Sequence, residues 1–218
     1  MHGSEVPGRD ENWREQTIAN TSEEQFNQEF ECEFLGSVNT LITSSKLKIL
    51  TYDDPLTRNA GLDIYEEPVA DNTYVMTVDV ARGITKDYSA FIVFDTTTIP
   101  YRIVAKYRNN VIKPMLFPNV IHQVACSYNH AYIMAEVNDI GGQVADILQY
   151  DLEYDNLLMC AMRGRAGQVV GQGFSGSKTQ LGVKMSTTVK KTGCSNMKTL
   201  IETDKLTFQD YDLSLIHI

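Results

Sequence analysis

Apolar runs in the middle of the chain predict β-strands. Residues 74–80, 90–94 and 101–107 are rich in β-branched and aromatic side chains, and short turn-forming segments separate them. Consecutive strands joined by short turns pair antiparallel. The pattern therefore predicts a three-stranded antiparallel meander.

The apolar period then changes from that of a strand to that of a helix. After Pro118, apolar residues recur at helical spacing as far as Tyr128. Residues 131–137 predict a strand, 141–149 a helix and 157–162 another short strand. A meander followed by strand–helix–strand units predicts an α/β domain, with a mixed β-sheet flanked by helices.

The N-terminal part of the chain has a helical pattern instead. Residues 1–35 predict a short helical segment, with one helix over 10–19 and a capping box at 22–25 that begins another. Residues 40–72 are mixed in character and contain two turn signals. They predict a connector rather than part of a core.

Composition excludes several classes of protein. The chain has 218 residues, of which 43% are hydrophobic and 22% charged, as is typical of soluble globular proteins. No apolar run approaches the roughly 20 residues that cross a bilayer, and the start has no signal-peptide pattern. We therefore expect no membrane partner. The four cysteines form no CxxC pair, which favours reduced thiols over a zinc cluster or a disulfide framework.

Charge is distributed unevenly along the chain. The net charge is −9, yet residues 156–198 contain no acidic residue. Their seven basic residues are Arg163, Arg165, Lys178, Lys184, Lys190, Lys191 and Lys198. An acidic protein with one basic stretch is predicted to bind a polyanion on one face. A solvated loop whose lysines confer solubility is the alternative.

Two carboxylates occupy unusual places in the predicted strands. Asp79 lies among valines inside 74–80, where burial without a partner or cation would be costly, and Glu136 lies near the end of 131–137. If these two strands are neighbours, the carboxylates meet at one edge of the sheet. Divalent metal ions relieve the repulsion between adjacent carboxylates. The alternative for Asp79 is a strand-end residue that faces water.

Two loops carry weaker signals. Asp87 lies in the predicted turn between the first two strands, where it is either a further metal ligand or a turn cap. Residues 171–179 approach the phosphate-binding GxxxxGK[ST] pattern, but an extra serine separates the glycine from the lysine. We interpret 171–179 as a flexible basic loop.

Several segments, in order along nearly the whole chain, resemble the large terminase subunit of tailed phages, most closely the myovirus type. Residues 78–91 resemble the first acidic motif of that family, and 135–141 resemble the second. Residues 182–196 are similar to its late basic segment. Residues 8–13 and 30–37 are similar to the end of its packaging ATPase domain.

This resemblance implies a ribonuclease-H-like, metal-dependent DNA endonuclease that cuts concatemeric viral DNA during packaging. It implies catalytic and metal-binding roles for Asp79 and Glu136, with Asp87 as a further metal ligand and Mg²⁺ or Mn²⁺ as cofactor. The family's third catalytic acid lies in a late His-Asp-Asp segment, which we do not find here. The residues expected to bind DNA are Arg163, Arg165, Lys178, Lys184, Lys190 and Lys191.

The resemblance also implies a division of the chain. It assigns 1–36 to the end of the ATPase domain, 37–72 to a connector and 73–212 to a nuclease domain incomplete at its C-terminus. Residues 213–218 resemble a translated sequencing adapter and are expected to be a non-native tail. Walker motifs are absent, so ATP binding would belong to a missing N-terminal domain.

The expected partners are double-stranded viral DNA, the portal protein and the small terminase subunit, in the host cytoplasm. Two alternatives remain open: a catalytically incomplete fragment that binds DNA or portal, and another ribonuclease-H-like nuclease such as a resolvase. The ATPase-like segment upstream argues against the second alternative.

Overall fold

The computed structural model describes residues 11–20, 41–43, 46–47, 49–84, 87–162, 168–171 and 179–210. The chain divides into two units, residues 1–49 with residue 218 and residues 50–217. In the first unit, helix α1 (Glu11–Asn20) confirms the helix predicted over 10–19. The capping box at 22–25 lies outside the described residues.

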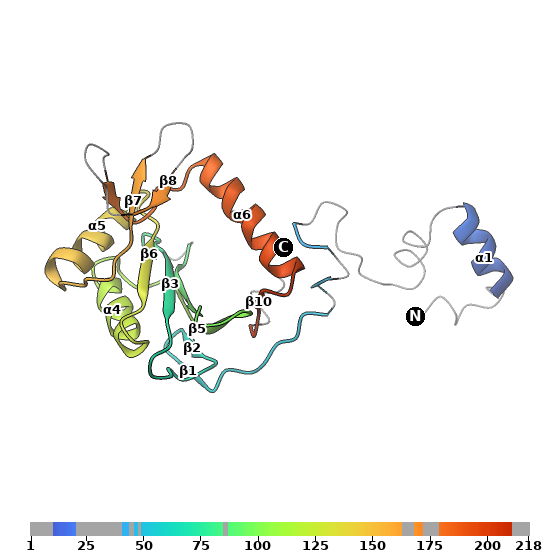
Figure 1. Cartoon of the computed structure of the whole chain (residues 1–218), viewed down its shortest axis with the longest axis horizontal. Helices are drawn as coiled ribbons and strands as arrows, with labels where there is room; N and C mark the ends of the chain where they lie inside the picture. The colour runs from blue at the N-terminus through green and yellow to red at the C-terminus, as the bar shows by residue number, and fades with distance from the viewer. Residues whose placement is uncertain are drawn as a thin grey trace. The chain divides into compact units, whose positions relative to one another are not determined.

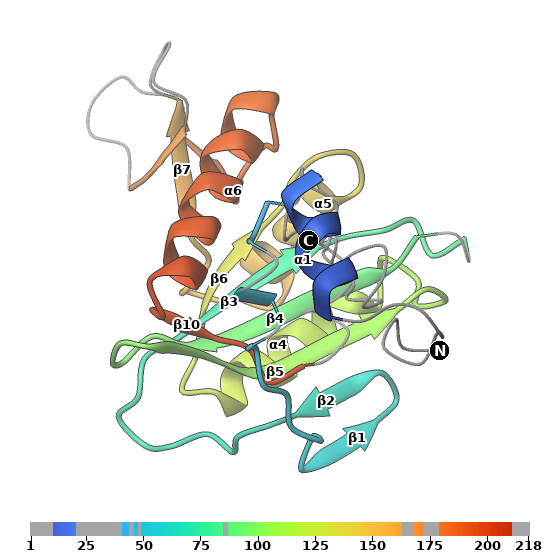
Figure 2. The same ribbon diagram turned by 90° about the vertical axis from the view of Figure 1, so that its right-hand side faces the viewer.

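The second unit contains a mixed, seven-stranded sheet in its described part (Figures 1 and 2). Six strands follow the order β1-β2-β5-β4-β3-β6, and β10 pairs with β5. The strands are β1 (Thr57–Asn59), β2 (Leu62–Ile64), β3 (Tyr74–Asp79), β4 (Ser89–Asp95), β5 (Tyr101–Asn109), β6 (Tyr132–Ala135) and β10 (Leu206–Thr207).

The predicted meander and crossover are both present. Strands β3, β4 and β5 pair antiparallel in sequence order. Helix α4 (Phe117–Ser127) then returns the chain to the other side of β3, where β6 pairs parallel to it. The condition stated for Asp79 and Glu136 to meet is therefore fulfilled, because the strands that carry them, β3 and β6, are neighbours.

One face of the sheet forms the hydrophobic core. Alternate residues of β3, namely Tyr74, Met76 and Val78, are buried and pack with α4 and with α5 (Gly141–Asp146). A π-helical turn, η2 (Ile147–Asp151), continues α5. Figure 1 shows α4 and α5 on the same side of the sheet. The opposite face of β3 keeps its side chains at least partly accessible.

The interpretation of 37–72 as a connector is wrong for residues 57–64. Strands β1 and β2 form a hairpin, and β2 pairs antiparallel with β5. Gly61, in the turn, has φ +91°, and its carbonyl accepts a 2.9 Å hydrogen bond from the backbone N–H of Arg108. The sheet therefore begins before residue 73, where the nuclease domain was predicted to start.

The strand predicted over 157–162 exists, but it does not extend the main sheet. Strand β7 (Met159–Met162) pairs antiparallel with β8 (Gln168–Val170) and β9 (Thr179–Leu181) in a separate three-stranded sheet. Single bridges, such as that between Ile133 and Leu157, connect this region to β6. A short apolar run predicts a strand but does not fix its partner.

A helix that the sequence interpretation missed follows the second sheet. Helix α6 (Thr187–Glu202) begins at Ser186, whose hydroxyl accepts a 3.3 Å hydrogen bond from the Val189 backbone N–H. Figure 1 shows α6 on the other side of the sheet from α4 and α5. Ile201 is its buried residue. Among the described ranges, no helix has the length and apolarity that crossing a membrane requires.

Candidate active site

Asp79 and Glu136 lie side by side at one edge of the main sheet. Asp79 is the last residue of β3, and Glu136 directly follows β6. The register pairs Val78 with Ala135, and the Glu136 N–H donates a 2.9 Å hydrogen bond to the Val78 carbonyl. Neighbouring strands are about 4.8 Å apart, so the two residues occupy adjacent positions.

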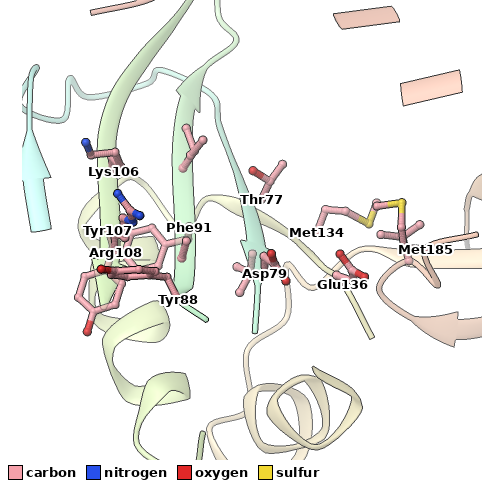
Figure 3. A pocket seen from close by; sticks show the side chains of 14 residues that line it. Thr77, Asp79, Tyr88, Phe91, Lys106, Tyr107, Arg108, Met134, Glu136 and Met185 are labelled. Atoms are coloured by element: carbon pink, nitrogen blue, oxygen red, sulfur yellow. The ribbon is translucent and has the colours of Figure 1, made fainter. Parts of the chain in front are cut away.

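The two carboxylates share the face of the sheet opposite the core. Val78 and Ala135 are buried, and successive side chains of a strand point to opposite faces. Asp79 and Glu136 therefore point the other way, into a cleft of about 510 Å³. Figure 3 shows both side chains at this cleft, with Met134 and Met185 beside Glu136.

The electrostatics of the pair favour a bound cation. Partial burial raises the pKa of Asp79, and the charge of Asp87 raises it further, whereas the Val80 backbone N–H lowers it. Burial and then the charge of Asp79 raise the pKa of Glu136, which Lys190 partly offsets. Each carboxylate is thus less stable when ionised than it would be in water.

Asp87 lies on an exposed turn close enough for its charge to act on Asp79. Ser89, a buried residue, forms hydrogen bonds with Ala81 and so brings the two ends of this turn together. Its hydroxyl accepts a 3.1 Å hydrogen bond from the Ala81 N–H and donates one of 3.3 Å to the Ala81 carbonyl. This contact closes the turn that carries Asp87 beside Asp79.

Two glycines allow other backbone segments to approach Glu136. A Cβ at Gly141 would lie less than 3.0 Å from the Glu136 carbonyl oxygen. A Cβ at Gly182, which has φ +69°, would come equally close to the Ala135 carbonyl. Next to it, the Val183 N–H donates a 2.8 Å hydrogen bond to that carbonyl. Glycine is therefore required on both sides of Glu136.

Side-chain contacts join three of the segments on which the resemblance was based, 78–91, 135–141 and 182–196. The Asn138 side chain donates a 3.0 Å hydrogen bond to the Met185 carbonyl and accepts one of 2.8 Å from its N–H. Arg82 forms a bidentate salt bridge with Asp139, with both N–O distances 2.6 Å. The two acidic motifs and the late basic segment thus converge around the cleft.

The predicted DNA-binding residues divide into two groups. Lys184, Lys190 and Lys191 are exposed, and the charge of Lys190 acts on Glu136. The structure therefore brings the first turn of α6 to the candidate site. Three other predicted residues, Arg163, Arg165 and Lys178, lie outside the described residues, as does most of the loop 171–179.

The late acids of the described part do not join Asp79 and Glu136 in a cluster. Asp210 is buried, where it accepts hydrogen bonds from the Tyr65 hydroxyl and the Lys106 ammonium group. Lys106 also lies 3.5 Å from Asp63. Within the described ranges, no group of three or more His, Cys, Asp or Glu side chains is arranged to hold a metal ion.

The residues present fit a divalent cation of the hard, oxygen-binding kind. Asp79 and Glu136 offer carboxylate oxygens from adjacent backbone positions, and each has a raised pKa. Mg²⁺ and Mn²⁺ prefer such ligands and keep several water molecules when few protein ligands are available. A cation between these side chains would offset their mutual repulsion.

Comparison with known proteins identifies the family. A family model described as Terminase RNaseH-like domain matches residues 76–215. The chain belongs to this family. The matched range begins in β3 and includes both Asp79 and Glu136, and it confirms the terminase resemblance drawn from the acidic motifs.

Solved structures show the same fold. The large terminase nuclease from thermophilic phage G20c with bound magnesium is 22% identical, with a TM-score of 0.60, over 82% of this chain and 79% of that one. Its cobalt-bound form is 23% identical, with a TM-score of 0.59, over 81% and 77%. The Thermus phage P74-26 large terminase nuclease domain is 24% identical, with a TM-score of 0.54, over 78% and 72%.

These findings confirm the predicted ribonuclease-H-like fold of the terminase domain. The roles assigned to Asp79, Glu136 and Asp87 stay predictions. The assignment of 1–36 to an ATPase domain also stays a prediction, because the family match begins later. The tail predicted over 213–218 lies outside the described residues.

The sequence interpretation missed two cationic residues that line this cleft, Lys106 and Arg108. Arg108 lies on β5 and lines the same cleft as Asp79 and Glu136. Its guanidinium carbon is 3.9 Å from the centroid of the Tyr88 ring. The available signal was an arginine directly after the strand predicted over 101–107, but its position relative to the acids depends on the register of three strands.

Proposed function

We propose that this terminase domain is a divalent-metal-dependent DNA endonuclease that cuts concatemeric viral DNA during packaging. The observation that supports this most is the position of Asp79 and Glu136 on adjacent strands, in one open cleft and on one face. Family membership supports DNA as the substrate.

In this proposal, Asp79 and Glu136 are catalytic residues that hold Mg²⁺ or Mn²⁺, with Asp87 as a further ligand from its turn. When bound, the metal would supply the charge that activates water and stabilises the leaving oxygen of the phosphodiester. Asn138 and the glycines at 141 and 182 keep the Glu136 backbone next to β3. The carboxylates must be ionised to act, so the cation and the ionised pair stabilise each other.

The basic residues would hold the DNA by its phosphates. Lys190, in the first turn of α6, is close enough to Glu136 for its charge to act on that carboxylate. Lys191 is the next residue of the helix, Lys184 precedes the helix, and all three lysines are exposed. We propose that Arg163, Arg165 and Lys178 extend this path. Binding through phosphates is independent of sequence, which suits an enzyme that must act on a whole genome.

The portal protein and the small terminase subunit stay proposed partners, and the host cytoplasm stays the proposed location. A second candidate function is DNA binding without cleavage. It is favoured by the lack of a third clustered acid within the described ranges, because metal sites for hydrolysis commonly use several carboxylates.

Conversion of supercoiled plasmid to nicked and linear forms separates the two functions. If the domain is a nuclease, the 218-residue chain should cut in Mn²⁺ or Mg²⁺ but not in EDTA, and slowly, because no third acid is clustered with Asp79 and Glu136 in the described ranges. Asp79→Asn and Glu136→Gln should reduce that cutting by about 100-fold, in line with the loss of a metal ligand. Asp155→Asn is the matched control. Asp155 is exposed and adjoins Asn156, whose carbonyl accepts a hydrogen bond from Ile133 near the opposite end of β6.

DNA binding measured in EDTA completes the test. Binding with no cutting by the wild-type chain would favour the second candidate function. Fusing a late His-Asp-Asp segment of the terminase type to the chain, with and without its acids, would then show whether a missing ligand is responsible. Equal cutting by the wild type, Asp79→Asn and Glu136→Gln would contradict the assignment of the site.

A further inference from the structure

We propose that Arg108, held against the ring of Tyr88, is a phosphate-binding residue that positions the DNA strand across the cleft. This rests on the proposed function, because it takes the scissile phosphate to lie at Asp79 and Glu136. It assigns a role to a residue outside both acidic motifs and outside the basic block of 156–198.

The position of Arg108 follows from the register of the sheet. Asp79 pairs with Ala90 on β4, and Ala90 pairs with Arg108 on β5. Residues paired in this way share a face, so Arg108 lies on the same open face as Asp79, two strands away. Figure 3 shows Arg108 and Tyr88 on one side of the cleft and Asp79 and Glu136 on the other.

The separation fits one DNA strand. Two strand spacings place the backbone of Arg108 about 10 Å from that of Asp79. DNA advances about 3.4 Å per nucleotide along each strand, so Arg108 can contact a phosphate within about three nucleotides of the one at Asp79. A strand lying across β3, β4 and β5 would meet the acids and then the guanidinium group.

The guanidinium group is oriented but not neutralised. Its central carbon lies 3.9 Å from the Tyr88 ring centroid, and Arg108 is exposed. No carboxylate in the described part of the chain forms a salt bridge with it, whereas Arg82 is paired with Asp139. Stacking on an aromatic face leaves the N–H groups at the edge of the planar guanidinium available, and these match phosphate geometry.

The neighbouring cation on the same strand has a different role. Lys106 is buried and bound to Asp210, with Asp63 at 3.5 Å, so its charge is used inside the protein. The backbone of Arg108 is also fixed, because its N–H donates to the Gly61 carbonyl. A rigid strand, an aromatic support and an uncompensated charge are what a preorganised phosphate contact requires.

Fluorescence anisotropy of a labelled DNA duplex in EDTA, over a series of salt concentrations, tests this without cleavage. We expect Arg108→Ala to weaken binding about tenfold and to lower the log–log salt slope by about 0.9, the value for one lost phosphate contact. Arg108→Lys should restore the slope but not the full affinity. Tyr88→Leu should leave the slope unchanged and weaken binding about threefold, since the charge remains but its orientation is lost.

Arg58→Gln is the matched control. Arg58 is also an exposed arginine, but it is paired with Asp63 and lies on β1, at the far edge of the sheet from β6. We expect its affinity and slope to equal those of the wild type. If Arg108→Ala and Arg58→Gln behave alike, or if Arg108→Ala binds like the wild type, the proposal is wrong.

Cleavage kinetics in Mn²⁺ distinguish this proposal from the proposed function. We expect Arg108→Ala to raise KM about tenfold and to keep kcat within about threefold, because the contact is made in the bound state as well as in the transition state. A wild-type chain that binds DNA but never cuts would overturn the nuclease proposal and leave the binding result for Arg108 intact. Loss of kcat with unchanged KM would overturn the role of Arg108.

Discussion

The side chain of Asn138 forms two hydrogen bonds with the backbone of Met185, 47 positions later in the chain. It donates to the carbonyl and accepts from the N–H, as a neighbouring strand would. The contact ties the turn after Glu136 to the segment that leads into α6. The Asn138–Met185 contact therefore connects the candidate metal ligands to α6, the helix that carries Lys190 and Lys191.

Asn138→Ala removes both hydrogen bonds and leaves the backbone groups of Met185 without this partner. We expect a loss of about 1–3 kcal/mol in the free energy of unfolding, measured by urea denaturation. The rate of DNA cleavage should fall by a larger factor than the affinity for DNA, because the turn after Glu136 is no longer held by the Asn138–Met185 hydrogen bonds. Asn119→Ala, at an exposed position of α4, should change stability by no more than about 0.5 kcal/mol. Equal effects of the two substitutions would contradict this account.

Gly182→Ala and Gly193→Ala form a matched pair. Gly182 has φ +69° and no room for a Cβ beside the Ala135 carbonyl, so alanine there should cost about 2–3 kcal/mol. Gly193 lies in α6 with nothing within 4 Å of a Cβ, so alanine there should stabilise by about 1 kcal/mol. Chemical denaturation measures both. A stable Gly182→Ala protein would show that the approach of 182–183 to β6 is not required.

The raised pKa values of Asp79 and Glu136 predict that removing either charge stabilises the metal-free protein, although it also removes a proposed metal ligand. A carboxyl group with a raised pKa in the folded state stabilises the protein when protonated, and this contribution is lost as pH rises through that pKa. At pH 7 without metal, Asp79→Asn and Glu136→Gln should each therefore stabilise the protein, by no more than about 1 kcal/mol given solvent screening.

Thermal unfolding in EDTA at two pH values measures this effect. The gain in Tm should be present at pH 7, should shrink as the pH falls through the raised pKa values of the folded protein, and should be absent below about 4, where the carboxyl groups are protonated in both states. Asp155→Asn, an exposed carboxylate away from the cleft, provides the control. A lower Tm for both site variants at pH 7 would show that the pair is not repulsive.

Lys190 and Lys191 are predicted to bind DNA phosphates. We expect Lys190→Ala and Lys191→Ala each to reduce affinity and to lower the log–log salt slope by about 0.9. Lys205→Ala is the control, because Lys205 is exposed beyond the far end of α6. Unchanged slopes for Lys190→Ala and Lys191→Ala would mean that these residues serve solubility, the alternative left open by the sequence.

The sequence predicted the central elements because their local patterns are strong. The run of β-branched and apolar residues from Tyr74 to Val80 marks β3, and the apolar face after Pro118 marks α4. These elements build the core, so hydrophobic period and tertiary structure agree. The neighbourhood of Asp79 and Glu136 then follows from the crossover between two well-marked strands.

The missed elements have weak local patterns. Strands β1 and β2 have three residues each, too few to show a period, and their pairing with β5 is a tertiary contact. Helix α6 buries Ile201 and little else, and it contains Gly193 and several threonines, so its sequence has little helical signal. The sequence did not predict a role for Arg108, because its place on the same face as Asp79 depends on the register of β3, β4 and β5.

Titration of the metal-free protein with Mn²⁺, with free Mn²⁺ followed by electron paramagnetic resonance, tests the central claim most directly. The account predicts saturable binding by the wild-type chain and by Asp155→Asn, with affinity at least tenfold lower for Asp79→Asn and for Glu136→Gln. Asp87→Asn should have a smaller effect than either. Identical Mn²⁺ binding by the wild type, Asp79→Asn and Glu136→Gln would show that these paired carboxylates are not the metal site.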